Sequence, residues 1–319
     1  MLWLKIFLSG LVLSYLLWAL DLSSIVDVLI TADRGLVAAA CLCVLAGQLL
    51  SALRWVWLAR GLGLIVKMSR KVQLYFLGMF LSLFLPSIIG GDVARGWLLA
   101  RGRKNAGWPA AASVVLERLN GMLALLLTVS LCMFFLQLPL LWVLLWNAGV
   151  LLFLMIISAT PWWWPRLLAS GWAGRRVGKI SGWKSLQITT PALRMAWWKS
   201  LPVSLLFQFL VVQAHVFLGM AVGLELSWFA YGFMVCLIAL ASALPLSFNG
   251  FGIREAGYIG LIVWFGGSSE AAAAMAALWV LILHIAALPG GIVLWRMGGR
   301  DLLKNRQLLD PFADSDKYK

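Results

Sequence analysis

Two stretches of the sequence, 86–95 (PSIIGGDVAR) and 245–254 (PLSFNGFGIR), place helix-breaking and polar residues inside apolar surroundings. Each begins with a proline and reaches an arginine nine residues later, Arg95 in the first and Arg254 in the second. A guanidinium group stays charged and binds phosphate through two parallel hydrogen bonds, so these arginines could contact a phosphate-bearing lipid headgroup. Proline and glycine allow a helix to break and its backbone N–H groups to approach such an anion. We assign Pro86 and Pro245 as the breaks and Gly90, Gly91, Asn249, Gly250 and Gly252 as further binding residues.

The helices that follow the breaks need a residue at their N-terminus that accepts backbone hydrogen bonds. Asp92 and Asn249 are the residue types that favour this position, and we expect them to be N-caps. A different interpretation of the arginines stays open. Arg95 could belong to a basic cytoplasmic cluster, and Arg254 could pair only with its neighbour Glu255.

Three further polar residues, Glu117, Arg118 and Asn120, lie inside a later apolar run. A charge within a membrane costs several kcal/mol unless it is paired, so such residues are candidates for function. On a helix Glu117 and Asn120 share a face, while Arg118 is turned by about 100°. We expect Glu117 to hold Arg95 and Arg118 to meet Asp92. These residues could support or switch the site, or could form only a structural salt-bridge network.

The two stretches lie 159 residues apart, half the length of the 319-residue chain. A repeat of half the chain length, interrupted at corresponding places, is typical of transporters that bind their substrate at broken helices. The charges of the loops indicate that the halves, about 36–135 and 195–295, run in opposite directions through the membrane. An inverted repeat would bring both breaks toward a shared site.

The composition predicts an all-α polytopic membrane protein, with 63% hydrophobic residues, 12% charged residues and a mean hydropathy of +0.94. We expect one transmembrane domain over 1–300 and a polar cytoplasmic tail over 301–319. Short apolar runs on both sides of each break predict two re-entrant hairpins, 72–103 and 228–265. Segment 228–247 is long enough to cross completely, so about seven or eight conventional spans are the alternative. We predict about six full spans, near 4–20, 36–58, 109–135, 140–159, 200–222 and 271–295.

The net charge of +14 comes from Lys and Arg in short loops, which is typical of cytoplasmic loops and does not indicate a nucleic-acid partner. This pattern predicts cytoplasmic N- and C-termini and assigns Arg54 to the cytoplasmic end of its span. Segment 160–199 holds seven Lys or Arg and seven Trp, which predicts a cytoplasmic interfacial segment. We expect the acidic segment 21–34 to be a solvated outer loop.

The remaining reactive side chains favour packing. The four cysteines lie in apolar runs, and His215 and His284 have no cysteine or carboxylate cluster nearby in sequence. We expect buried, hydrogen-bonded histidines, with proton coupling as the alternative. No metal, cofactor or nucleotide site is expected.

Segments 86–95, 115–118 (VLER) and 244–255 resemble motifs of the lysylphosphatidylglycerol synthase transmembrane region family, the membrane half of multiple peptide resistance factor. The resemblance implies a flippase-type lipid module with re-entrant helices in inverted halves. The full-length factor continues into a soluble aminoacyl-transferase domain that this sequence does not contain, so we expect no lipid aminoacylation and no enzyme activity. The resemblance marks as motif positions Gly91, Asp92, Arg95, Glu117, Arg118, Asn249, Gly250, Arg254 and Glu255.

The sequence therefore predicts a lipid translocase, or flippase, of the bacterial inner membrane. Its substrate would be a phospholipid, a glycolipid or a polyprenyl-linked lipid. The alternative is an accessory or scaffold protein that binds a lipid- or envelope-biosynthesis enzyme, or a second copy of itself, and transports nothing. A membrane transferase is disfavoured because no outer loop is large enough to hold an acceptor site.

Overall fold

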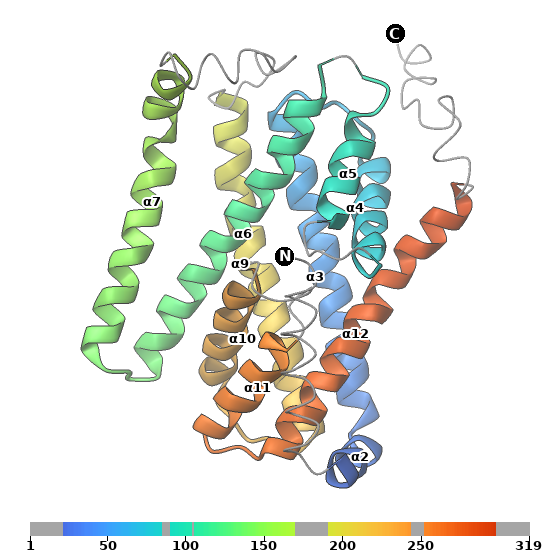
Figure 1. The fold of residues 1–319 in the computed structure, drawn as a ribbon, viewed down its shortest axis with the longest axis vertical. Coiled ribbons are helices and arrows are strands. Elements are labelled where there is room, and N and C mark those ends of the chain that lie inside the picture. The colour runs from blue at the N-terminus through green and yellow to red at the C-terminus, as the bar shows by residue number, and fades with distance from the viewer. Residues whose placement is uncertain (1–21, 85–89, 104, 170–190, 244–251, 298–319) are drawn as a thin grey trace.

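A computed structural model describes residues 22–84, 90–103, 105–169, 191–243 and 252–297, with the side chains of Leu22 and of 157–169 excepted. Every regular element among these residues is a helix (Figure 1). Four helices are long and apolar enough to cross a membrane, which takes about 20 residues. The predicted fold class is thus confirmed: the chain is a polytopic helical membrane protein. These long helices are α3 (Arg34–Gly61), α6 (Gly107–Phe135), α9 (Pro191–Ala221) and α12 (Ser269–Arg296).

Two of the long helices, α3 and α12, begin at a side-chain cap. The Asp33 carboxylate accepts hydrogen bonds from the backbone N–H groups of Gly35 and Leu36 at the start of α3. The Ser268 hydroxyl accepts one from Ala271 N at the start of α12. Such caps satisfy N–H groups that have no partner within the helix.

Four shorter helices form two side-by-side pairs (Figure 1). The first pair is α4 (Met68–Ser82) with α5 (Gly90–Ala100), and the second is α10 (Trp228–Ala243) with α11 (Ile253–Trp264). At a rise of 1.5 Å per residue, α4 and α5 are about 22 and 16 Å long, shorter than the 30 Å hydrocarbon core of a bilayer. The connections, and with them Pro86, lie outside the described residues. Re-entry into a membrane stays a prediction.

The helix directions differ between the earlier and later parts of the chain (Figure 1). In this view α3 runs upward, α4 descends to mid-height, α5 returns to the top and α6 crosses downward. The later helices do the opposite: α9 descends, α10 rises to mid-height, α11 returns to the bottom and α12 rises. α3 and α9 form the most extensive contact between helices. The exact repeat boundaries stay a prediction.

Two predicted boundaries are wrong. Residues 22–31 form the helix α2 (Leu22–Thr31) instead of a loop, because Ile25, Val28 and Leu29 repeat at helical spacing and pack on the core. Helices α7 (Leu140–Ala169) and α9 extend into the two ends of the predicted segment 160–199, so its boundaries are wrong, while its place at the membrane interface stays a prediction. Helix α7 packs against α6 at the edge of the bundle. The predicted span 4–20 and tail 301–319 lie outside the described residues.

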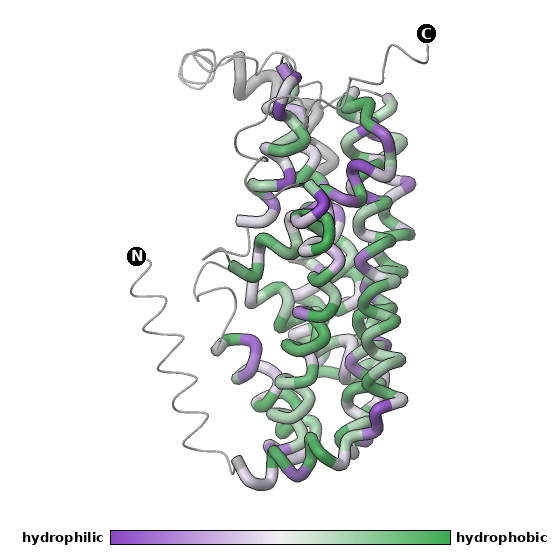
Figure 2. The backbone as a smooth tube through the Cα atoms, turned by 90° about the vertical axis from the view of Figure 1, so that its right-hand side faces the viewer, coloured by the Kyte–Doolittle hydropathy of each residue, from purple (hydrophilic) through white to green (hydrophobic). Residues whose placement is uncertain are grey.

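Most residues along the helices are hydrophobic, and hydrophilic residues gather near the two ends of the bundle and at a few points between them (Figure 2). Some helices approach each other without intervening side chains. A Cβ atom on Gly290 of α12 would overlap the carbonyl of Phe76 in α4. A Cβ atom on Gly91 of α5 would overlap the carbonyl of Gly78 in α4. The α4–α5 pair is therefore a tightly packed unit seated on α12.

Candidate functional site

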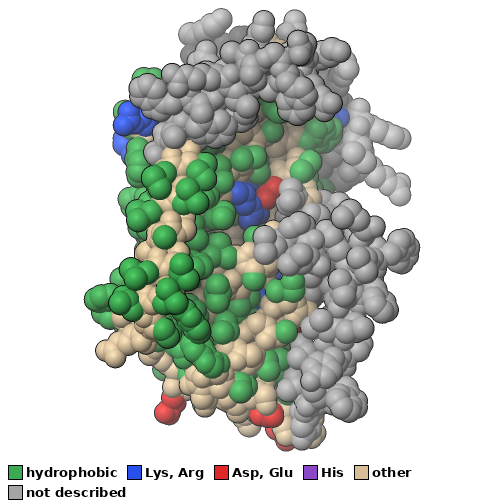
Figure 3. Space-filling model, turned by 60° about the vertical axis from the view of Figure 1, so that its left-hand side comes forward, with side chains coloured by type: hydrophobic (Ala, Val, Ile, Leu, Met, Phe, Trp, Pro, Cys, Tyr) green, Lys and Arg blue, Asp and Glu red, His purple; other side chains and the backbone are tan. Residues whose placement is uncertain are grey.

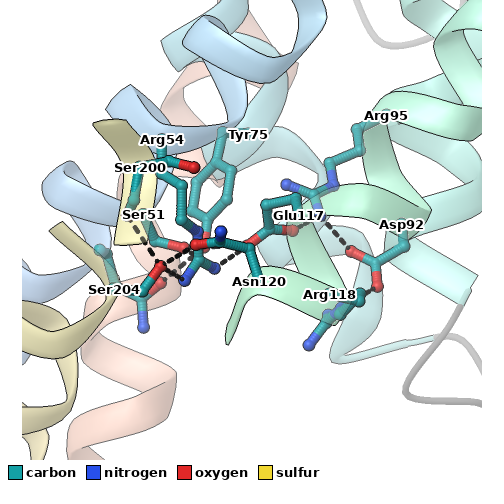
Figure 4. Close-up of polar contacts among 11 residues, drawn as sticks. Ser51, Arg54, Tyr75, Asp92, Arg95, Glu117, Arg118, Asn120, Ser200 and Ser204 are labelled. Carbon is teal, nitrogen blue, oxygen red and sulfur yellow. Dashed lines mark hydrogen bonds and ion pairs between the residues drawn. The ribbon is translucent and has the colours of Figure 1, made fainter. Parts of the chain in front are cut away.

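Arg95 lies inside the protein and bridges two carboxylates (Figure 4). Its residue is 2% exposed, on the second turn of α5. Its Nη2 lies 2.9 Å from Oδ1 of Asp92 and 2.5 Å from Oε2 of Glu117. The predicted pair between Arg95 and Glu117 is confirmed. A buried charge of this kind needs such partners, since removing one would leave the other uncompensated.

Arg118 pairs with Asp92 from the neighbouring helix α6, as predicted. Its Nε donates to Oδ2 of Asp92 at 2.7 Å, and its Nη2 lies 2.6 Å from the same oxygen. The side chain of Arg118 is 57% exposed, whereas that of Asp92 is 10% exposed. Asp92 is the third residue of α5, so the N-cap prediction for it is wrong: its carboxylate joins two arginines instead.

Arg54 joins the same cluster from α3. It forms an ion pair with Oε1 of Glu117, and its Nη1 donates to the hydroxyl of Ser204 on α9 at 2.9 Å. The Ser51 hydroxyl donates to the same Glu117 oxygen at 3.2 Å. Assigning Arg54 to the cytoplasmic end of its span was wrong: it lies seven residues, about 10 Å, before the end of α3 and is buried.

Asn120 connects α6 to α9 at the edge of the cluster. Its Oδ1 accepts a hydrogen bond from the Ser204 hydroxyl at 2.5 Å, and its Nδ2 donates to the carbonyl of Trp197 at 3.2 Å. Asn120 and Glu117 are both buried, and Arg118 is exposed, so the predicted division of α6 into faces is confirmed. Gly121 makes room for Arg54, whose Nη1 would lie 3.2 Å from a Cβ atom at this position.

Two aromatic rings enclose the Arg95 guanidinium. The rings of Trp55 and Tyr75 each have their centroid 4.9 Å from Cζ of Arg95. Nε and Nη1 of Arg95 have no hydrogen-bond partner among the described residues, so contact with the ring faces is what stabilises this side of the group. Each ring is held by its own hydrogen bond, Trp55 to the Ser113 hydroxyl and Tyr75 to Oε1 of Gln48.

Among the described residues, this ion-pair cluster contains three arginines (54, 95 and 118) and two carboxylates (92 and 117), which leaves one positive charge. Arg118 is the twelfth residue of the 29-residue helix α6, about 16 Å from its first residue. The cluster therefore lies well inside the length of a candidate span. Basic and acidic side chains come to the surface together in a hollow on a largely hydrophobic face (Figure 3).

The second stretch is organised differently. Gly252 has a φ of 85°, which favours glycine, and it is the N-cap of α11. The Glu255 carboxylate accepts a hydrogen bond from Gly252 N at 2.7 Å, so it stabilises the start of its own helix. The N-cap prediction for Asn249 is wrong because the cap is three residues later. Pro245, Asn249 and Gly250 lie outside the described residues, and a site shared by both breaks stays a prediction.

The histidines differ in their surroundings. His215 is buried, with Nδ1 2.8 Å from the Val211 carbonyl and Nε2 2.7 Å from the Tyr258 hydroxyl. This bears out a packed, hydrogen-bonded histidine. His284 is exposed, so the expectation of a buried histidine is wrong there; its Nδ1 lies 2.8 Å from the carbonyl of Val280 on its own helix. The four cysteines are free thiols, and within the described ranges no group of histidine, cysteine and carboxylate side chains could hold a metal ion.

Sequence reasoning missed the residues that surround the cluster from other helices, namely Ser51, Arg54, Trp55, Tyr75 and Ser204. The signal available for Arg54 was its distance from the end of the apolar run. The aromatic and serine residues carried no comparable signal, because their role depends on which helices pack together.

Comparison with protein-family models identifies the family of the chain. A family model described as the lysylphosphatidylglycerol synthase TM region matches residues 2–290. No curated protein matches the chain. The matched residues include the whole ion-pair cluster and both interrupted stretches.

Proposed function

Because this chain belongs to the lysylphosphatidylglycerol synthase transmembrane region family, whose function is lipid-related, we propose that it is a lipid translocase in which Arg118 receives the headgroup phosphate. The observation that carries the proposal is the exposed guanidinium of Arg118 at the end of a cluster with one excess positive charge. Within a membrane-spanning helix, an excess positive charge that no anion balances costs several kcal/mol. A lipid phosphate would neutralise it.

The chemistry of the two arginines supports a division of roles that differs from the prediction. Arg95 is buried and already contacts two carboxylates, so it positions Asp92 and Glu117. Arg118 has more than half of its side chain exposed, so it can bind a phosphate without disrupting the packing of the core. A guanidinium presents donors in a fixed fork that matches two phosphate oxygens.

The orientation and location follow from the charges. The ends of α3 and α12 in the upper part of Figure 1 carry Arg60 and Arg296, and we place this end in the cytoplasm by the positive-inside rule. We propose that this membrane is the bacterial inner membrane. We further propose that the protein moves its lipid, which would be a phospholipid, a glycolipid or a polyprenyl-linked lipid, without covalent chemistry.

The test is a reconstituted translocation assay with fluorescent phosphatidylglycerol in proteoliposomes, read by the loss of fluorescence when dithionite reaches the outer leaflet. The variant is Arg118→Gln, and the matched control is Arg296→Gln, an exposed arginine in the last turn of α12. A hydrogen bond to a charged group contributes about 1.5–3 kcal/mol, so we expect Arg118→Gln to weaken lipid binding by about tenfold to a hundredfold. Native mass spectrometry of the same samples measures the bound lipid directly.

A folded Arg118→Gln protein that binds and moves the lipid as wild type does would refute the role of Arg118. If wild-type protein moves none of the three lipid classes and co-purifies in fixed ratio with a biosynthetic enzyme, the accessory function replaces translocation.

A further inference from the structure

We propose that two ion pairs latch the α4–α5 unit onto α6, and that a lipid phosphate bound at Arg118 opens this latch. The inference rests on the proposed function, since it takes Arg118 as the phosphate site. It adds a consequence of binding: the headgroup would release the short helix pair from its neighbour. The latch is defined as the pairs Asp92–Arg118 and Arg95–Glu117.

Both latch residues of α5 have a second partner on their own helix. Asp92 Oδ1 lies 2.9 Å from Nη2 of Arg95, three residues further along α5. The same Nη2 atom makes the contact with Glu117 on α6 at 2.5 Å. One nitrogen of Arg95 is therefore shared between a bond within α5 and a bond between helices.

Phosphate binding would change how these bonds are shared. A phosphate that takes the Arg118 guanidinium leaves Asp92 with Arg95 as its remaining ion-pair partner in the cluster. The stronger pull of Asp92 draws Arg95 away from Glu117. Glu117 stays compensated because it keeps Arg54 and the Ser51 hydroxyl. No charge is left without a partner, and both pairs between α5 and α6 are lost or weakened.

The packing decides where the movement would occur. Glycine contacts hold α5 against α4 and α4 against α12, with backbone touching backbone. Between α5 and α6, by contrast, a Cβ atom on Gly96 would lie at an ordinary van der Waals distance of 3.5 Å from Val114. The α5–α6 contact thus depends more on its ion pairs than the other two do. Separation at this contact, with α4 staying on α12, is the expected motion.

The test measures the α5–α6 separation by electron paramagnetic resonance on a background in which the four native cysteines are replaced by alanine. Spin labels are attached at Val93→Cys on α5 and Val115→Cys on α6, both exposed positions. A control pair at Met68→Cys on α4 and Ile292→Cys on α12 monitors the contact expected to stay closed. The protein is held in a neutral maltoside detergent that contains no phosphate.

Addition of phosphatidylglycerol should reduce the dipolar coupling of the α5–α6 labels and leave the control pair unchanged. Inorganic phosphate is added separately, so that an effect of free phosphate is distinguished from that of a lipid headgroup. Arg118→Gln should reduce the coupling without any lipid, because it frees Asp92 to draw Arg95 away from Glu117 as a phosphate would, and it should abolish the response to lipid. Asp92→Asn should reduce the coupling to a smaller extent, because it removes one latch pair but leaves the pair of Arg95 with Glu117 in place.

The outcomes separate the two proposals. If native mass spectrometry shows lipid bound through Arg118 while the coupling is unchanged by lipid and by both variants, the latch is refuted and the binding site stands. If both variants open the contact but no lipid binds, the ion pairs hold the helices together and the claim that a headgroup opens them is wrong, together with the proposed function. An equal change in the control pair would refute the assignment of the movement to α5 and α6.

Discussion

Replacing Glu117 by glutamine tests whether the cluster is balanced as described. Glu117 is buried and contacts Arg54, Arg95 and Ser51. The substitution preserves shape but removes one of two negative charges, so the three arginines of the cluster would face a single carboxylate. Removing one partner of a buried ion pair typically destabilises a protein by about 3–5 kcal/mol, and we expect a loss of this size.

A second substitution makes the test specific to charge. The double variant Arg54→Gln, Glu117→Gln removes one cation and one anion, and the cluster returns to one excess positive charge on Arg95, Asp92 and Arg118. We expect it to be more stable than the sum of the single variants predicts, by about 0.5–3 kcal/mol, which is the range for directly contacting residues.

The assay is reversible unfolding in mixed micelles of maltoside and dodecyl sulfate, followed by circular dichroism. The control is Glu225→Gln, an exposed glutamate between α9 and α10, which should change the free energy of unfolding by less than about 0.5 kcal/mol. If Glu117→Gln is as stable as this control, Glu117 does not compensate the arginines. If the double variant loses the full sum of both single effects, the two residues are not coupled.

Three further predictions concern a close helix contact, two buried tyrosine hydroxyls and a buried lysine. Gly91→Ala should destabilise the protein by about 1–3 kcal/mol in the same unfolding assay, because its Cβ atom would overlap α4. Gly149→Ala, where a Cβ atom meets nothing within 4 Å on α7, should stabilise it by up to about 1 kcal/mol, and equal effects of the two would contradict the close helix contact. Tyr258→Phe should lower the free energy of unfolding by about 1–3 kcal/mol, since it leaves a ring nitrogen of the buried α9 histidine without its hydrogen bond. Tyr231→Phe should be neutral or stabilising, since the buried Tyr231 hydroxyl has no hydrogen-bond partner among the described residues; a reversal of this order would disprove the assignment. Lys71, in the first turn of α4 and outside the four long helices, is buried and donates to the Leu64 carbonyl at 2.8 Å, and burial, with the charges of two nearby arginines, lowers its pKa to about 7. Because the unfolded chain then binds more protons between this pKa and the ordinary lysine value, thermal stability should rise with pH across that interval, and Lys71→Met should flatten the rise.

The sequence predicted the short helices and the pairing of charges because both depend on local information. Proline and glycine mark where a helix ends, and the helical period places Glu117 and Arg118 on different faces of α6. The need to pair each intramembrane charge then selects partners from a small number of candidates. The pairs of Arg95 with Glu117 and of Arg118 with Asp92 follow from these two rules.

The rest depends on packing between helices that no local pattern specifies. Arg54 and Ser204 lie 150 residues apart and meet because α3 packs along α9. Their separation in sequence carries no trace of this contact. The enclosure of Arg95 by Trp55 and Tyr75 has the same origin, since those rings belong to α3 and α4. The prediction of Asp92 as an N-cap is wrong because its carboxylate forms ion pairs with two arginines, which stabilise it more than a backbone N–H group would.

The repeat in the sequence does not imply two equal binding sites. Arg95 and Arg254 occupy corresponding positions 159 residues apart, but the positions that correspond to Asp92, Glu117 and Arg118 hold Phe251, Ala276 and Ala277. The second half thus lacks, at these places, the carboxylates that hold Arg95 and the arginine that reaches the surface. The only nearby acid in its interrupted stretch, Glu255, is engaged at the start of α11. In the proposed function, charge-based recognition therefore lies in the first half, and the second half contributes, through α12, the surface on which the α4–α5 unit stays seated.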